Sequence, residues 1–279
     1  MALNASSREP LSAGLGAARS SGLTRAEARL RGRATAPQGT WALLATRHIS
    51  PWVSWATVRF TSLSADAVTV LSIVSGLGAA ALVLLANPVA YTFAVLLLQL
   101  AYVFDCADGE VARMRGTAGR RGQYLDLIGH VIQNRALYAA SSVVLLRFAD
   151  GAPWALAIAF AGVALASPYG EQSKAQVLGN TIGLPGEHGG GPRGALPAGN
   201  SPGARAYRLY RRVAFLWEYP AAMNSFCAAI LLDIGWMVMV PAAGSVVLPL
   251  FTAGFLGTLA LKQTVNAIRL LDRRIWSST

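Results

Sequence analysis

Charged residues are scarce in this chain, and acidic residues are the scarcest of them. Only 13% of the 279 residues are charged, whereas 54% are hydrophobic and the mean hydropathy is +0.44. So little charge excludes an ordinary soluble domain and is typical of a protein with several membrane spans. There are two cysteines, Cys106 and Cys227, both in apolar stretches. This excludes a disulfide framework of the kind that staples small secreted domains.

A long apolar run is missing from residues 1–40, which are rich in Ser, Ala, Gly and Arg. We therefore expect no secretory signal peptide here, and instead a basic, poorly ordered tail. Because Glu9 and Glu27 are its only acids, the segment also resembles a mitochondrial transit peptide. The sequence favours a bacterial cytoplasmic membrane, with the mitochondrial inner membrane as the alternative.

The net charge of +11 is consistent with either nucleic-acid binding or membrane orientation. The basic residues do not alternate with aromatic residues on a soluble scaffold, so we expect no nucleic-acid partner. Of the 24 Lys and Arg residues, only Arg147 falls in the predicted outer loops, at 87–88, 147–152 and 241–244. The positive-inside rule therefore predicts that both termini and the inner loops are cytoplasmic.

Six apolar segments, each near the ~20 residues needed to cross a bilayer, predict an all-α polytopic membrane protein. The predicted spans are Asp66–Ala86, Val89–Ala112, Gln123–Leu146, Pro153–Val177, Tyr219–Val240 and Ser245–Ile268. Residues 41–62 combine tryptophans with basic residues, which predicts an interfacial amphipathic helix interrupted near Pro51. The predicted membrane domain covers residues 63–279 and includes a flexible, Gly- and Pro-rich cytoplasmic loop at 179–205.

The most informative acidic residues follow the apolar part of the second predicted span. Asp105 and Asp108 are three residues apart, and Asp126 and His130 are four apart, so each pair shares a helix face. Ionisable residues at membrane depth are candidates for function because placing charge in lipid is costly. Together the two faces would place three carboxylates and an imidazole around a small volume. Such a site suits a divalent cation and phosphate oxygens.

This run resembles the signature of the CDP-alcohol phosphotransferases, D-x2-D-G-x2-A-R-x8-G-x3-D-x3-D. Here it reads Asp105-x2-Asp108-Gly109-x2-Ala112-Arg113-x8-Gly122-x3-Asp126-x3-His130, so seven of eight positions match and His130 replaces the last acid. A looser family pattern, T-P-N-x-V-T, is matched clearly only at Thr69 and the apolar residue before it. We expect Asp66, in the same stretch, to cap the first membrane helix.

The resemblance implies transfer of a phosphate-containing group, such as phosphatidyl, from a CDP-activated lipid donor to a small alcohol acceptor, with release of CMP. It implies one or two divalent cations, Mg²⁺ or Mn²⁺, held by Asp105, Asp108, Asp126 and His130. The cytidine diphosphate would lie against Asp105, Gly109, Ala112, Arg113 and Gly122. Asp126 and His130 are the catalytic candidates, with His130 serving either as a ligand or as the base for the acceptor hydroxyl. The family also implies a homodimer in the lipid membrane.

Two other functions stay open because His130 departs from the signature. The site can be interpreted as binding an isoprenyl diphosphate and ionising it, as terpene cyclases and prenyltransferases do, since diphosphate departure needs no carboxylate base. Alternatively, the chain is a non-catalytic relative that serves as a membrane scaffold or nucleotide sensor.

Overall fold

The computed structural model describes residues 47–165 and 221–271. Over these ranges the protein consists of seven α-helices and one short 3-10 helix, with no strand, which confirms the all-α class. The predicted basic tail, the first residues of the interfacial segment and the predicted loop at 179–205 lie outside the described residues.

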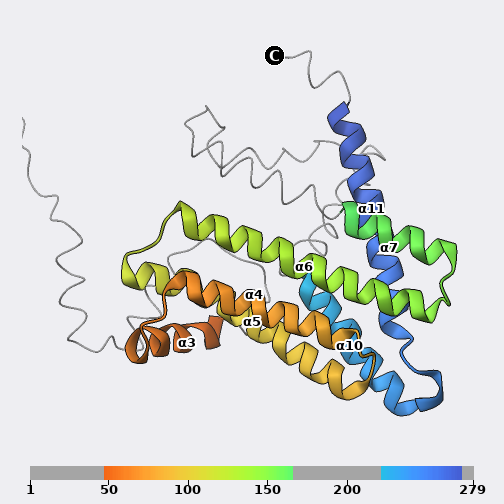
Figure 1. The fold of residues 1–279 in the computed structure, drawn as a ribbon, viewed down its shortest axis with the longest axis horizontal. Coiled ribbons are helices and arrows are strands. Elements are labelled where there is room, and N and C mark those ends of the chain that lie inside the picture. The colour runs from red at the N-terminus through yellow and green to blue at the C-terminus, as the bar shows by residue number, and fades with distance from the viewer. Residues whose placement is uncertain (1–46, 166–220, 272–279) are drawn as a thin grey trace, which may run out of the picture.

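Three consecutive helices carry the acidic motif. They are α4 (Ala65–Val83), α5 (Pro88–Arg115) and α6 (Arg120–Phe148), and α4 packs against both of the others (Figure 1). A shorter helix, α3 (Arg47–Phe60), packs against α5. The remaining helices are α7 (Pro153–Leu165), α10 (Ala221–Met239) and α11 (Val247–Leu271). Of these, α10 packs on α5, and α11 packs on α6 and α7.

Three of the described helices, α4, α5 and α10, are long and apolar enough to cross a membrane. Helices also occupy the third and sixth predicted positions, as α6 and α11, but their crossing of the membrane stays a prediction. At the fourth position the described apolar stretch, Pro153–Ala164, is shorter than a full span. The predicted continuation to Val177 lies outside the described residues. Three spans are therefore supported, rather than the six expected.

An aromatic cluster joins α6, α10 and α11 in the core. Tyr138 of α6 lies 5.5 Å from Phe226 of α10 between ring centroids, and Phe226 lies 5.0 Å from Phe255 of α11. These offset and edge-on contacts bury large rings at favourable geometry. They hold the second half of α6 against α10 and α11. The first half of the same helix carries Asp126 and His130.

The turn between α5 and α6 brings the two halves of the acidic motif together. Gly116 ends α5 with a φ of 67°, a left-handed conformation that glycine adopts without steric cost. Only residues 116–119 separate the two helices, so α6 turns back beside α4. The predicted boundaries at Ala112 and Gln123 were each three residues too far from this turn, because polar residues extend both helices beyond the apolar segments.

The predicted break of the interfacial helix near Pro51 is wrong, because α3 runs without interruption from Arg47 to Phe60. A proline lacks the N–H that would bond four residues back, and its ring crowds the carbonyl of that residue. Here that residue is Arg47, the first one described in this helix. The lost hydrogen bond therefore falls at the described beginning of α3, where it does little to break it. Placement of α3 at a membrane surface stays a prediction.

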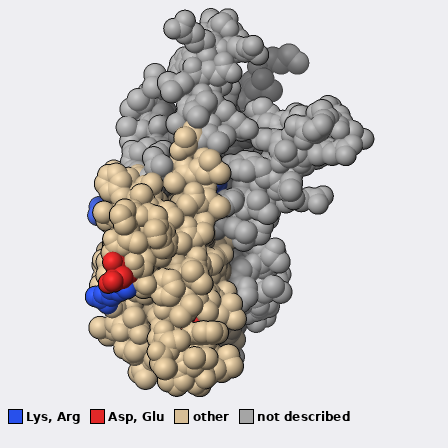
Figure 2. All heavy atoms as spheres, turned by 90° about the vertical axis from the view of Figure 1, so that its right-hand side faces the viewer, with Lys and Arg blue, Asp and Glu red and all other residues tan. Residues whose placement is uncertain are grey.

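The predicted outer loops gather at the end of the bundle away from the acidic motif (Figure 1). The Arg147 guanidinium donates to the Leu84 carbonyl at 2.6 Å, and the Tyr91 and Ser245 hydroxyls lie 3.2 Å apart. Figure 2 views this side, where charged atoms cover little of the described surface. Here Asp233, fully buried in α10, accepts hydrogen bonds from the Ser245 hydroxyl and from the Val246 and Val247 amides at the start of α11.

Candidate functional site

All eight residues of the acidic motif line one cavity between α4, α5 and α6. The cavity has a volume of about 260 Å³, and its motif residues are Asp105, Asp108, Gly109, Ala112, Arg113, Gly122, Asp126 and His130. The first five come from α5 and the last three from α6. The fold thus brings together two stretches that the sequence places on separate helix faces.

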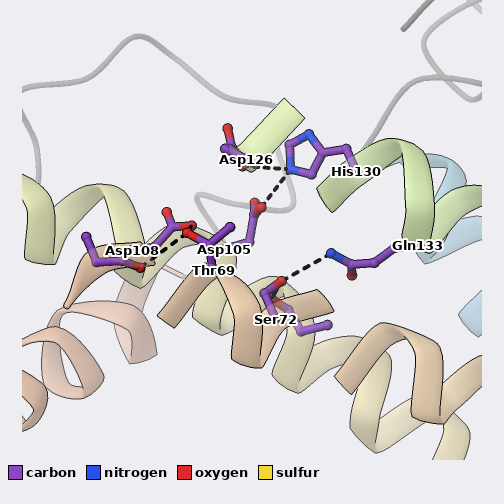
Figure 3. Close-up of polar contacts among 9 residues, drawn as sticks. Thr69, Ser72, Asp105, Asp108, Asp126, His130 and Gln133 are labelled. Carbon is purple, nitrogen blue, oxygen red and sulfur yellow. Dashed lines mark hydrogen bonds and ion pairs between the residues drawn. The ribbon is translucent and has the colours of Figure 1, made fainter. Parts of the chain in front are cut away.

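Three of these lining residues form a carboxylate–imidazole cluster (Figure 3). The Nε2 atom of His130 is 2.6 Å from Oδ1 of Asp105 and 3.2 Å from Oδ1 of Asp126. One ligand atom from each of the three residues lies within 4.8 Å of the others. Carboxylate and imidazole groups converging this closely form a donor set that fits a divalent cation.

Asp108 is separate from this three-residue cluster, although it lines the same cavity. Its Oδ2 accepts a 2.6 Å hydrogen bond from the Thr69 hydroxyl of α4, and both side chains are buried. Hydrogen bonds to a carboxylate are shorter and stronger than neutral ones, so Thr69 holds this acid in place. Asp108 is not in the group whose ligand atoms converge, and its part in holding a cation stays a prediction.

Small residues shape the part of the cavity expected to receive the nucleotide. A Cβ placed on Gly109 would come 3.2 Å from Nη1 of Arg113, which shows that the guanidinium lies close against this glycine. A Cβ on Gly122 would meet nothing within 4 Å, so the cavity is open there. The guanidinium adds positive charge beside three carboxylates. This combination suits a ligand that carries a diphosphate.

A second group of polar side chains lies about one turn further along α6 than His130, where α6 packs against α4. Gln133 donates from Nε2 to the Ser72 hydroxyl at 3.3 Å, and Ser72 donates to the Ala101 carbonyl of α5 at 2.8 Å. Gln133 lies on the same helix as Asp126 and His130 (Figure 3). Its side chain packs against Gly76, where a Cβ would come 2.7 Å from Gln133 Cγ. No larger residue fits at position 76 without moving Gln133.

The expectation that Asp66 caps the first membrane helix is wrong. Ser64 is the N-cap of α4, and its hydroxyl accepts a hydrogen bond from the Ala67 amide. Asp66 is in the first turn and forms a 3.3 Å ion pair with Arg121 of α6. Both Ser64 and Asp66 are suitable cap residues, and the start of the helix decides which of them takes the role.

Sequence reasoning missed two groups that hold the site. Thr69 matched a loose pattern, but nothing in the sequence indicates that its partner is Asp108. The buried Glu110, which lies between signature positions, accepts hydrogen bonds from Ser50 and Ser54 of α3. An acidic residue inside the signature run could have been recognised as a candidate for a buried polar contact. Its partners could not, because they are more than 50 residues away in the sequence.

Comparison with known families agrees with this geometry. Residues 62–183 match the family model described as CDP-alcohol phosphatidyltransferase. This segment belongs to that family. The match begins before α4 and includes α4, α5, α6 and α7, and hence every residue of the acidic motif. No curated protein matches the chain.

The match of residues 62–183 to the CDP-alcohol phosphatidyltransferase family gives the coarse function. The family transfers a phosphate-linked group from a CDP-alcohol and is generally dependent on divalent metal ions. With the three apolar helices, it also indicates an integral membrane protein that acts in lipid synthesis. The group of Asp105, Asp126 and His130 is able to hold such an ion.

Proposed function

We propose that the protein transfers a phosphatidyl group from a CDP-activated lipid to a small alcohol, releasing CMP, and that the reaction depends on a divalent cation. The observation that carries this proposal is the single cavity that collects all eight motif residues, including the convergent Asp105, Asp126 and His130. The family match supplies the reaction class.

Asp105, Asp126 and His130 are the residues that would hold a cation, Mg²⁺ or Mn²⁺. Three ligand atoms within 4.8 Å of one another satisfy the first requirement of a metal site. When bound, the cation would neutralise diphosphate charge and the charge that develops on the departing CMP. Asp108 and Arg113 border the same cavity and would orient the diphosphate and the cytidine end of the donor.

The proposed step is one displacement at phosphorus. The acceptor hydroxyl oxygen forms a bond to the phosphorus that bears the diacylglycerol, and the bond from that phosphorus to the bridging oxygen breaks. CMP leaves with the electron pair, and the hydroxyl proton passes to a protein carboxylate. Asp126 is the suitable acceptor, because 42% of its side chain is exposed, compared with 13% for Asp105.

His130 serves the site as a ligand in this proposal rather than as the base. Its Nε2 points at the oxygens of Asp105 and Asp126, which is the direction a shared cation requires (Figure 3). Hard cations prefer oxygen, and imidazole suits Mn²⁺ better than Mg²⁺. Replacement of the family's last acid by His130 therefore favours Mn²⁺ over Mg²⁺ in this protein.

The test is a transfer assay with labelled CDP-diacylglycerol and a panel of small alcohols, in Mg²⁺ and in Mn²⁺, with CMP measured directly. We expect His130→Ala to lower CMP release by about 10–100-fold, the usual effect of disturbing a metal site. His130→Asp should restore activity and move the preference toward Mg²⁺. Asp126→Asn should abolish turnover, whereas Asp150→Asn, the same change in an exposed turn at the opposite end, should not.

Parallel reactions with prenyl diphosphates separate the other interpretations. Release of pyrophosphate without CMP would replace the proposal by ionisation of an isoprenyl diphosphate. Binding of cytidine nucleotides with no turnover in either metal would identify a silent relative. A His130→Ala variant as active as the parent in both metals would show that the imidazole is a bystander.

We also propose that the cavity opens on the cytoplasmic side. The proposal rests on the basic inner segments of the sequence and on the loops that gather at the opposite end of the bundle. A cysteine at Asp150, in a background without Cys106 and Cys227, should react with an impermeant thiol reagent added to intact cells. Labelling of a cysteine at Gly119, beside the cavity, but not at position 150, would invert this orientation.

A further inference from the structure

Glu110 is a buried acid inside the signature run, at a position to which the family signature assigns no residue. The residue borders the cavity, yet only 7% of it is exposed. Oε1 accepts a 2.9 Å hydrogen bond from the Ser50 hydroxyl, and Oε2 accepts a 2.6 Å hydrogen bond from the Ser54 hydroxyl. Both serines belong to α3 and are fully buried.

These contacts distinguish Glu110 from the other acids of the cavity. Both carboxylate oxygens already face hydroxyl donors on a neighbouring helix, so neither is directed at the cluster of Asp105, Asp126 and His130. A buried carboxylate that loses its donors is strongly destabilised. The Ser54 hydroxyl also lies 2.9 Å from the Ser50 carbonyl of its own helix and 3.4 Å from the Ala107 carbonyl of α5, but its shortest contact is the one to Glu110. The two serine hydroxyls therefore tie α3 to α5 through both oxygens of the Glu110 carboxylate.

The acidic stretch of α5 contacts three different helices. Asp105 reaches His130 of α6, Asp108 reaches Thr69 of α4, and Glu110 reaches α3. Positions 108 and 110 differ by about 200° around the helix axis, since each residue of an α-helix turns by about 100°. Thr69 and Ser54 therefore hold nearly opposite sides of α5. Contacts on opposite sides of a helix resist its rotation about its own axis.

We propose that Glu110 is a positioning residue, which through Ser50 and Ser54 uses α3 to fix the rotation of α5 and hence the direction of the cavity acids. The catalytic part of this inference rests on the proposed transferase function. The mechanical part, that these hydroxyls hold α3 against α5, does not.

A matched pair of variants isolates the hydroxyl. Ser54→Thr and Ser54→Val add similar bulk to the same buried position, but only threonine keeps the donor to Glu110. We expect backbone amides of α3 to exchange with deuterium at least tenfold faster in Ser54→Val than in Ser54→Thr, with α10 amides as an internal reference. CMP release should be roughly 10–150-fold lower in Ser54→Val, from the loss of one hydrogen bond to a carboxylate.

A second substitution separates positioning from direct chemistry. Glu110→Gln keeps the shape and one acceptor oxygen, and its amide is able to donate to a serine hydroxyl, so activity should stay within about tenfold of the parent. Activity as low as that of Asp105→Ala would show instead that Glu110 is itself a ligand or a reacting group, which overturns the proposal. Ser142→Thr and Ser142→Val supply the control, because Ser142 is a buried serine whose hydroxyl, among the described residues, donates to the Tyr138 carbonyl of its own helix.

Amide exchange in α3 and CMP release test the two parts of the proposal independently. Equal amide exchange in Ser54→Thr and Ser54→Val overturns the tie between α3 and α5. Faster exchange in Ser54→Val with equal CMP release overturns the positioning role. If the parent releases no CMP from any CDP-lipid, the proposed function fails. In that case, cytidine nucleotide affinity takes the place of turnover, and equal affinity of the two variants overturns the positioning role.

Discussion

Replacing Thr69 by Val is the most direct test of how the cavity acids are held. The two side chains have nearly the same shape, so the substitution removes one hydroxyl and little else. That hydroxyl donates to Oδ2 of Asp108 at 2.6 Å, with 5% of Thr69 and 7% of Asp108 exposed. Water therefore has little access to replace the lost donor.

The magnitude follows from the chemistry of this contact. A hydrogen bond to a charged group contributes about 1.5–3 kcal/mol, and its loss leaves the carboxylate oxygen buried without that donor. At about 1.4 kcal/mol per factor of ten, this corresponds to roughly 10–150-fold in the population of correctly held Asp108. CMP release should fall by a factor in that range. The free energy of unfolding in detergent should fall by a similar amount.

Thr69→Ser is the matched control, since it keeps the hydroxyl and loses only a methyl group. It should retain most of the activity and most of the stability. A double-mutant cycle with Asp108→Ala tests the contact itself through the free energy of unfolding. Effects that add within about 0.5 kcal/mol would show that the two side chains do not interact, and would refute the reasoning.

Three other predictions address the metal ligands, the second group of polar side chains and the far end of the bundle. Asp105→Ala should abolish metal-dependent turnover and weaken Mn²⁺ binding, measured by electron paramagnetic resonance, and unchanged Mn²⁺ affinity would contradict the assignment. Gly76→Ala should lower the free energy of unfolding by about 1–3 kcal/mol, because its methyl group would displace the packed Gln133. Gly235→Ala, whose Cβ would meet nothing within 4 Å, is the control and should cost nothing. Asp233→Ala should lower the unfolding free energy by about 2–4 kcal/mol, because a helix cap and a hydroxyl acceptor are lost together; a change below about 0.5 kcal/mol would contradict this.

Local patterns in the chain were sufficient for much of the fold and for the membership of the site. Apolar segments of membrane length predict α4, α5 and α10, because the bilayer selects for length and hydropathy alone. The spacing of the acidic motif predicts which side chains share a face, because helical periodicity is a property of a single helix. The resemblance to the family signature added Gly109, Ala112, Arg113 and Gly122, and all eight motif residues line the cavity.

The boundaries of the helices were less predictable. The α5–α6 turn depends on Gly116 in a left-handed conformation, and the cap of α4 depends on the choice between Ser64 and Asp66. At the turn, polar residues extend both helices beyond their apolar segments, so hydropathy does not mark where they end. At the start of α4, two neighbouring residues are both suitable caps, so the sequence does not decide between them.

The tertiary structure alone decided which acids work together. It pairs Asp105 with His130, directs Asp108 to Thr69, and places Glu110 against Ser50 and Ser54. Hydrogen bonds between helices depend on how each helix is rotated and shifted against its neighbours. Those rotations result from packing over the whole bundle, and the spacing of residues within any one helix does not determine them.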